Sequence, residues 1–364
     1  MATRRGVLGG MLAALAPAPG WAEAGDPAWL AAARPGDGSY RLLGLDASGA
    51  EVFRLPLPDR GHAAAAHPFR PEAVAFARRP GRFAVVLDCR DGRVAAELAS
   101  PPGRHFYGHG AYSADGALLL TTENDYEAGR GVIGVWDVAT GYQRVEEISS
   151  GGTGPHEMLR LPDGGFAVAN GGIETHPDTD REILNEATMR PNLTFLTASG
   201  GVAEVVTLEP ALRLNSIRHL AVRGDGLVAA AMQWQGAPEA RPPLLGVFRK
   251  GAAAQLLEAQ AVEHARMQGY AGSVAFSGDG TMVAITSPKG GVMQVWDADT
   301  GDFLGSYADP DICGVATGPD GFCITTGAGV VAGLAGITPM WRVAGGPVYD
   351  NHLVAISPGG GQSL

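Results

Sequence analysis

Five histidines recur at the same place in a repeated unit of the chain. The motifs that hold them are His62 in GHAA, His109 in GHGA, His156 in PHEM, His219 in RHLA and His352 in NHLV. Imidazole is the commonest metal ligand among side chains, and it suits iron, copper, zinc and nickel. Residues that recur at one phase of a repeat form a ring around one axis, so we expect these side chains to converge.

The repeated unit has the pattern of a β-hairpin. Three of the histidines are followed by a short apolar run, an Asp-Gly turn and a second apolar run, and Asp-Gly between apolar runs is typical of hairpin turns. The same pattern without a histidine begins near Gly272 and at Cys313. Two more strand-like runs follow each hairpin, for example VIGVWDV and YQRVEEI. Each unit therefore predicts four short antiparallel strands.

The spacing of the units predicts a β-propeller, whose blades have four strands and recur at roughly 40–50 residues. Two successive histidine intervals are 47 residues, and the third is 63 because a polar stretch at 171–191 is inserted in the third unit. Seven hairpin starts predict an all-β, seven-bladed propeller of the WD40 or YVTN type, with six or eight blades as alternatives. The last unit is incomplete, so we expect N- and C-terminal strands to close one blade together.

The first 24 residues indicate an export leader. They combine Arg4 and Arg5, a short apolar run and the small-residue pattern AEA, which together resemble a twin-arginine signal peptide. We expect a single propeller domain over 25–364 in the periplasm. The apolar run is too short for a membrane anchor.

Composition narrows the classes of partner and chemistry. The net charge of −11 disfavours binding to nucleic acid or anionic lipid. The chain has no CxxC, CxxCH, GxSxG or HExxH motif, so no catalytic residue is assigned. Cys313 and Cys323 are expected on neighbouring strands of one hairpin, but their spacing does not decide whether they form a disulfide.

Further polar residues are expected near the mouth of the central channel. Cys313 takes the place of the histidine in the sixth unit, and the other candidates are His105, Tyr107, Glu123, Asp125, Glu157 and Arg218. Carboxylates there would hold the second nitrogen of a ligating imidazole. An alternative for His109 is a structural hydrogen-bonded support with Trp136, as in WD repeats. His67 and His176 are expected in solvent.

The chain resembles a bacterial family of exported propeller proteins of unknown function. The motifs that carry the resemblance are RGH, GHG, ARRPGRFAVVLD, TTEND, GPHE, NGGIETHPD, RPNL, LNSIRHL, MQWQG and DNHLVAI. Such proteins are often encoded beside imelysin-like proteins and a di-haem oxidoreductase in iron-acquisition clusters. The resemblance implies a periplasmic role in metal handling and supplies no catalytic residues.

Three functions are therefore considered. The first is a periplasmic metal-binding propeller that takes iron or copper, or a metal chelate, at the five histidines for metal acquisition. The second is a metal-free scaffold that docks a partner, for example an imelysin-like or di-haem protein. The third is a metal-dependent hydrolase or an oxidoreductase at the same funnel, which needs an open coordination position.

Overall fold

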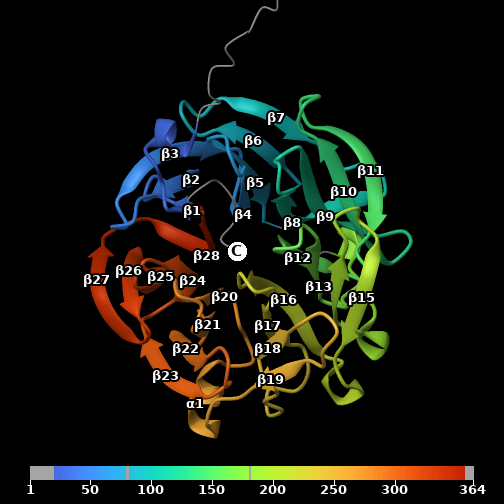
Figure 1. Ribbon diagram of the computed structural model, residues 1–364, viewed down its shortest axis with the longest axis vertical. Coiled ribbons are helices and arrows are strands. Elements are labelled where there is room, and N and C mark those ends of the chain that lie inside the picture. Colours follow the sequence, from blue (N-terminus) through green and yellow to red (C-terminus); the bar gives the residue numbers. More distant parts are fainter. Residues whose placement is uncertain (1–19, 79–81, 180–181, 357–364) are drawn as a thin grey trace, which may run out of the picture.

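A computed structural model describes residues 20–78, 82–179 and 182–356. In these residues seven four-stranded antiparallel sheets are arranged around one axis (Figure 1). The prediction of a seven-bladed propeller is confirmed. Most of the expected export leader lies outside the described residues. Its last part forms the 3₁₀ helix η1 (Trp21–Ala24), where the Trp21 indole donates to the His67 carbonyl at 2.9 Å.

The innermost strand of every blade lines the central axis, and each contacts the innermost strands of the two neighbouring blades. These strands are β4 (Gly61–Ala66), β8 (Arg104–Tyr112), β12 (Pro155–Arg160), β16 (Asn215–Val222), β20 (Ser273–Phe276), β24 (Ile312–Gly318) and β28 (Val348–Ala355). All seven predicted hairpin starts fall on these strands or directly before them.

The second and third strands of the blades are almost completely buried. The second strands are β5 (Glu72–Ala77), β9 (Leu118–Asp125), β13 (Phe166–Asn170), β17 (Val228–Trp234), β21 (Met282–Ser287), β25 (Gly321–Thr326) and β1 (Trp29–Arg34). The third strands are β6 (Ala84–Asp88), β10 (Arg130–Asp137), β14 (Asn192–Leu196), β18 (Leu245–Phe248), β22 (Val292–Asp297), β26 (Val330–Ala335) and β2 (Tyr40–Leu45).

The fourth strands form the rim and alternate between exposed and half-buried residues. They are β7 (Val94–Leu98), β11 (Gln143–Ser149), β15 (Val202–Thr207), β19 (Gln255–Leu257), β23 (Phe303–Ala308), β27 (Thr338–Ala344) and β3 (Glu51–Leu57). Besides η1, the short helices of the described ranges lie in connections between strands: η2 (Pro177–Thr179), η3 (Glu186–Thr188), η4 (Pro210–Leu212) and α1 (Ala261–Arg266). The first two of these lie in the segment 171–191, which connects β13 to β14.

The Asp-Gly turns join the first and second strands of their blades as predicted. Their glycines adopt positive φ, at 69° for Gly116, 83° for Gly164, 85° for Gly226 and 73° for Gly280. Residues other than glycine rarely adopt a positive φ, which explains why the Asp-Gly pattern is a clear signal for these hairpins.

The apolar core lies between adjacent blades rather than inside one sheet. One buried cluster, for example, joins Phe76 of the β4–β7 blade to Leu119 and Trp136 of the β8–β11 blade. The ring is closed by β28, which pairs with β1 through Ala31 and Leu353. The predicted closure by both ends of the chain is confirmed.

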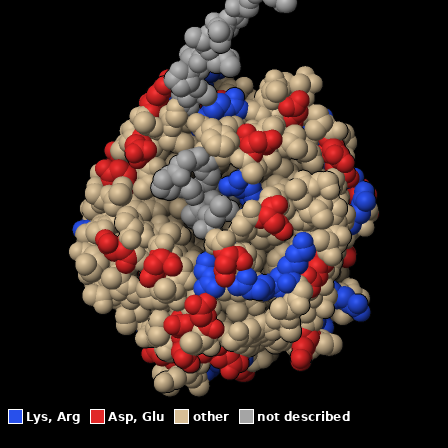
Figure 2. Space-filling model, viewed as in Figure 1, with Lys and Arg blue, Asp and Glu red and all other residues tan. Residues whose placement is uncertain are grey.

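Asp and Glu side chains are scattered over the face seen in Figure 2, with Lys and Arg between them. Among the described residues no helix is long and apolar enough to cross a membrane.

Candidate metal centre

The structure brings the five predicted histidines together at the axis. Adjacent ring centroids are 4.5 Å apart for His352 and His62, 4.9 Å for His62 and His109, 4.9 Å for His109 and His156, and 4.7 Å for His156 and His219. His219 and His352 complete the circle at 4.5 Å, although two blades without such a histidine separate their strands. We call these five residues the histidine cluster.

Irregular strand pairing directs these side chains toward the axis. In all five histidine-bearing blades the register shifts where the histidine stands. His156 is the extra, bulged residue of β12, whereas in β16 the bulged residue is Arg218 and His219 follows it. A bulge turns a side chain out of the regular alternation. The five histidines therefore share one site without sharing one strict phase of the repeat.

A glycine permits the rings of His62 and His109 to approach each other closely. Gly108 has a φ of 98°, and a Cβ atom there would lie 2.8 Å from Cδ2 of His62. The Nε2 atoms of His62 and His109 consequently come within 3.2 Å of each other. This contact explains the GHG motif in physical terms.

Two carboxylates lie beside the cluster, the half-buried Glu157 and the buried Asp350. Glu157 places Oε1 3.5 Å from Nδ1 of His109 and Oε2 3.4 Å from Nδ1 of His219, and it also accepts a hydrogen bond from the Leu220 amide at 2.8 Å. Asp350 lies 3.7 Å from Nδ1 of His62. Glu157 was among the expected residues, whereas Asp350 was not.

Asp350 is held by two guanidinium groups as well. Arg60 and Arg78 contact its oxygens at 2.7 and 2.6 Å. The sequence signal that could have pointed to Asp350 is its place two residues before His352, inside the DNHLVAI motif. Arg78, just after β5, gave no comparable signal.

Burial sets the protonation of the cluster. It lowers the pKa of His62 to about 3, against the opposing effect of Asp350, and it lowers the pKa of His156, His219 and His352 as well. Burial alone would raise the pKa of Glu157, but its contacts with two imidazoles outweigh burial and hold that pKa well below its ordinary range. His62, His156, His219 and His352 are therefore neutral near pH 7, beside the carboxylate anion of Glu157.

The cluster has the donor set of a transition-metal site. Nitrogens at adjacent positions on one ion, each about 2.0–2.1 Å from it, lie roughly 2.9–3.4 Å apart, and the 3.2 Å contact between His62 and His109 fits this range. The triads His62–His109–His156 and His109–His219–His352 each bring their ligand atoms within 4.8 Å. Either triad could therefore supply three imidazole nitrogens to one ion.

Several of these nitrogens are buried without a hydrogen bond. Among the described residues, Nδ1 of His156 and Nε2 of His352 have neither a hydrogen bond nor an ion pair, whereas Nδ1 of His62 and Nδ1 of His219 lack a hydrogen bond but face Asp350 and Glu157. Buried polar atoms nearly always have a partner, and an absent ion is one recognised reason for an exception.

A cavity of about 260 Å³ adjoins the cluster. It is bordered by His62, His156 and His219, and by Ile173, Thr175 and Ile183 of the segment 171–191. Its remaining lining residues are Arg78, Tyr107, Arg218, Gln233, Gln235, Tyr270 and Asn351. The predicted funnel residues Tyr107 and Arg218 thus lie at this cavity.

Cys313 does not join the cluster, so that expectation was wrong. Its sulfur lies 3.4 Å from the carbonyl oxygens of Thr325 and Asp350, in the apolar contact between two blades. Burial raises the pKa of this thiol to about 12, which keeps it protonated. Cys89, Cys313 and Cys323 are all free and buried.

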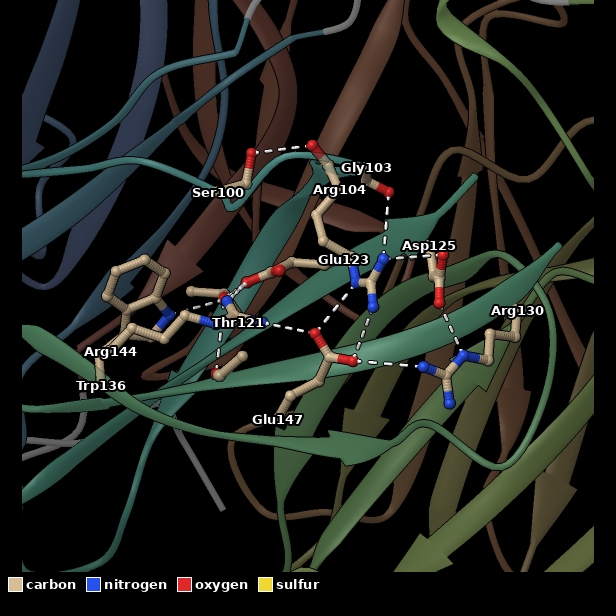
Figure 3. Close-up of polar contacts among 11 residues, drawn as sticks. Ser100, Gly103, Arg104, Thr121, Glu123, Asp125, Arg130, Trp136, Arg144 and Glu147 are labelled. Atoms are coloured by element: carbon tan, nitrogen blue, oxygen red, sulfur yellow. Dashed lines mark hydrogen bonds and ion pairs between the residues drawn. The ribbon is translucent and has the colours of Figure 1, made fainter. Parts of the chain in front are cut away.

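Glu123 and Asp125 also lie away from the cluster, in an ion-pair network within the β8–β11 blade (Figure 3). Arg144 donates to Glu123 at 2.6 Å, and Arg104 and Arg130 hold Asp125 at 2.8 and 2.7 Å. Glu123 is thus held by the outer strand β11, whereas Asp125 is held by the inner strand β8 and the third strand β10. Their role is structural.

His105 likewise points away from the cluster. Its Nε2 lies 3.3 Å from the Asn124 amide, and its ring stacks on Tyr126 at 5.9 Å. The expectation that His67 is solvated was also wrong, since its exposed fraction is 3%.

The alternative for His109, a structural hydrogen-bonded support with Trp136 as in WD repeats, is not found in this blade. The Trp136 indole donates to Oγ1 of Thr121 at 2.9 Å, while His109 contacts His62 and Glu157. The third-strand tryptophan thus has a partner of its own, and His109 belongs to the cluster.

Fold and site together define a seven-bladed propeller with a buried imidazole cluster at its axis. The chain belongs to the family described as protein of unknown function DUF1513, whose model matches residues 55–356. No curated protein matches it. Among solved structures it is similar to the hydrazine synthase of Kuenenia stuttgartiensis, with 14% identity, a TM-score of 0.59 and coverage of 88% of this chain and 96% of that one. At this identity the likeness concerns the fold alone.

Proposed function

We propose that this protein is a periplasmic metal-binding β-propeller that holds iron or copper in the histidine cluster and serves metal acquisition or handling. The observation that carries the proposal is the convergence of five imidazoles, among which Nδ1 of His156 and Nε2 of His352 are buried without a partner. Imidazole-rich sites suit both metals, and affinities for divalent ions rise toward copper along the first transition row. The leader with Arg4 and Arg5 supports the periplasmic location.

The two carboxylates support the same proposal. Ligating imidazoles usually place their second nitrogen against a carboxylate or carbonyl, which orients the ring and raises its basicity. Glu157 stands in this relation to His109 and His219, and Asp350 to His62. From the gene neighbourhood that the family resemblance implies, we propose an imelysin-like or di-haem periplasmic protein as the partner that delivers or receives the metal.

The test is the metal content of the protein purified from the periplasm without chelators or a polyhistidine tag. We expect near-stoichiometric iron or copper by mass spectrometry, and its loss in the double variant His109→Ala/His156→Ala. His176→Ala is the matched control, because this partly exposed histidine lies on the segment 171–191 away from the cluster. A wild-type protein that is metal-free and cannot be loaded afterwards would overturn the proposal.

A further inference from the structure

The cavity beside the histidine cluster has an unusual charge for this protein. The chain carries a net charge of −11, yet among the described residues that line the cavity none is acidic and two are arginines, Arg78 and Arg218. Three imidazoles of the histidine cluster form part of the wall. Guanidinium groups in the wall of a hollow attract small anions.

The two arginines are positioned by separate features of the fold. Arg218 is the bulged residue of β16, so the irregular pairing that precedes His219 also brings this guanidinium to the cavity. Arg78 is anchored by Asp350 through its Nη1 at 2.6 Å. A planar guanidinium matches the paired oxygens of a carboxylate, and anchoring reduces the entropy lost when it binds one.

The remaining wall is suited to hydroxyl and carboxyl groups. Gln233, Gln235 and Asn351 contribute amides, and Tyr107 and Tyr270 contribute phenols. The volume of about 260 Å³ lies just under the roughly 300–1,000 Å³ typical of pockets for drug-sized ligands. The ligand that fits is therefore small and rich in oxygen.

We propose that this cavity binds a small polycarboxylate, held by Arg218 and Arg78, that also coordinates an ion in the histidine cluster. The inference deepens the proposed function, because it names a metal polycarboxylate chelate as the species that the protein takes up. The unpartnered Nδ1 atom of His156, a residue that lines the cavity, supplies the second and independent observation. The carboxylate oxygens would fill coordination positions that the imidazoles leave open.

Citrate is the probe for the test, measured by isothermal titration against the metal-free and the metal-loaded protein. We expect citrate to bind, more tightly to the loaded form, and Arg218→Gln to weaken it at least about tenfold, as expected for loss of a hydrogen bond to a charged group. Arg241→Gln, which changes an exposed arginine outside the cavity, is the matched control and should bind citrate as the wild type does.

The outcomes separate this inference from the proposed function. Citrate that binds neither form, or binds Arg218→Gln as well as wild type, overturns the inference while metal loading still supports the cluster. Citrate that binds the metal-free protein through Arg218, in a protein that takes no metal, overturns the proposed function and leaves an anion site. Binding of inorganic phosphate with the same Arg218 dependence, and none of citrate, overturns the assignment to carboxylates.

Discussion

Glu157 connects two members of the histidine cluster that lie on strands of different blades. Its carboxylate faces Nδ1 of both His109 and His219 and accepts the Leu220 amide. We expect Glu157→Gln to fold normally and to weaken metal binding about 10–100-fold, because the amide keeps the shape but not the charge that orients the rings. Competition with a chromogenic chelator measures the affinity.

The control for this change is Glu239→Gln, which removes the same charge from an exposed loop. An equal loss of affinity in both variants would mean that net charge alone, rather than contact with the imidazoles, explains the effect. An unchanged affinity in Glu157→Gln would remove the carboxylate from the metal site.

Most residues of the histidine cluster could be predicted from the sequence, because five histidines that each precede a similar apolar run are expected at equivalent positions of the repeat. What could not be predicted depends on pairings across the ring. Asp350 reaches His62 and Arg78 only because the chain ends close on each other, and Cys313 turns into the contact between blades. No spacing along the chain encodes either contact.

At the scale of the element, the inner-strand hairpins were predictable from their turns, and the bulges were not. A turn needs local chemistry such as Asp-Gly, whereas a bulge follows from how an inner strand packs against its neighbours. The bulge places His156 and Arg218 at equivalent positions of β12 and β16. An imidazole in one blade thus corresponds to a guanidinium in the next.

The β4–β5 hairpin contains a histidine that makes stability depend on pH. Nδ1 of His67 accepts hydrogen bonds from the amides of Phe69 and Arg70, and its Nε2 lies 3.2 Å from both the Gly116 carbonyl and the Arg70 side chain. The Tyr112 ring packs on it at 4.9 Å. Burial first, and then Arg70, lower its pKa to about 4.

The folded state therefore resists protonation of His67, while the unfolded chain accepts a proton near pH 6.5. The stability contributed by this group is complete above pH 6.5 and falls as the pH drops to about 4, by at most about 3 kcal/mol. We expect His67→Asn, whose amide oxygen can accept the same two amides, to flatten this slope. Urea unfolding at pH 7 and pH 4.5 measures how much the free energy of unfolding changes with pH in the wild type and in His67→Asn. An equal change in both proteins would mean that His67 is not the source of the pH dependence. His176→Asn, on a partly exposed histidine, is the control.

At the scale of the whole molecule, the closed ring makes β28 critical. It is the innermost strand of the last blade, it pairs with β1, and it contacts β24 and β4 on either side. It also carries His352 and Asp350. Loss of this one strand would open the sheet edge of β1 and remove two groups from the metal site.

Leu353 tests this closure. Its side chain is 6% exposed and packs in the apolar cluster that contains Trp29 and Ala31. Because an aspartate there would bury a charge without a partner, we expect Leu353→Asp to lower the free energy of unfolding by about 3 kcal/mol or more. Val348→Asp, at a position 53% exposed in the same strand, should change it by no more than about 0.5 kcal/mol.

The unfolding curves also report whether the ring acts as one unit. Each blade buries its apolar face only against its neighbours, so opening the ring at β28 should weaken every contact around it. We expect tryptophan fluorescence and far-UV circular dichroism to follow one coincident urea transition in wild type and in Leu353→Asp, shifted to lower urea in the variant. Two separated transitions would mean that the blades near β28 unfold independently, and closure would then be a local rather than a global source of stability.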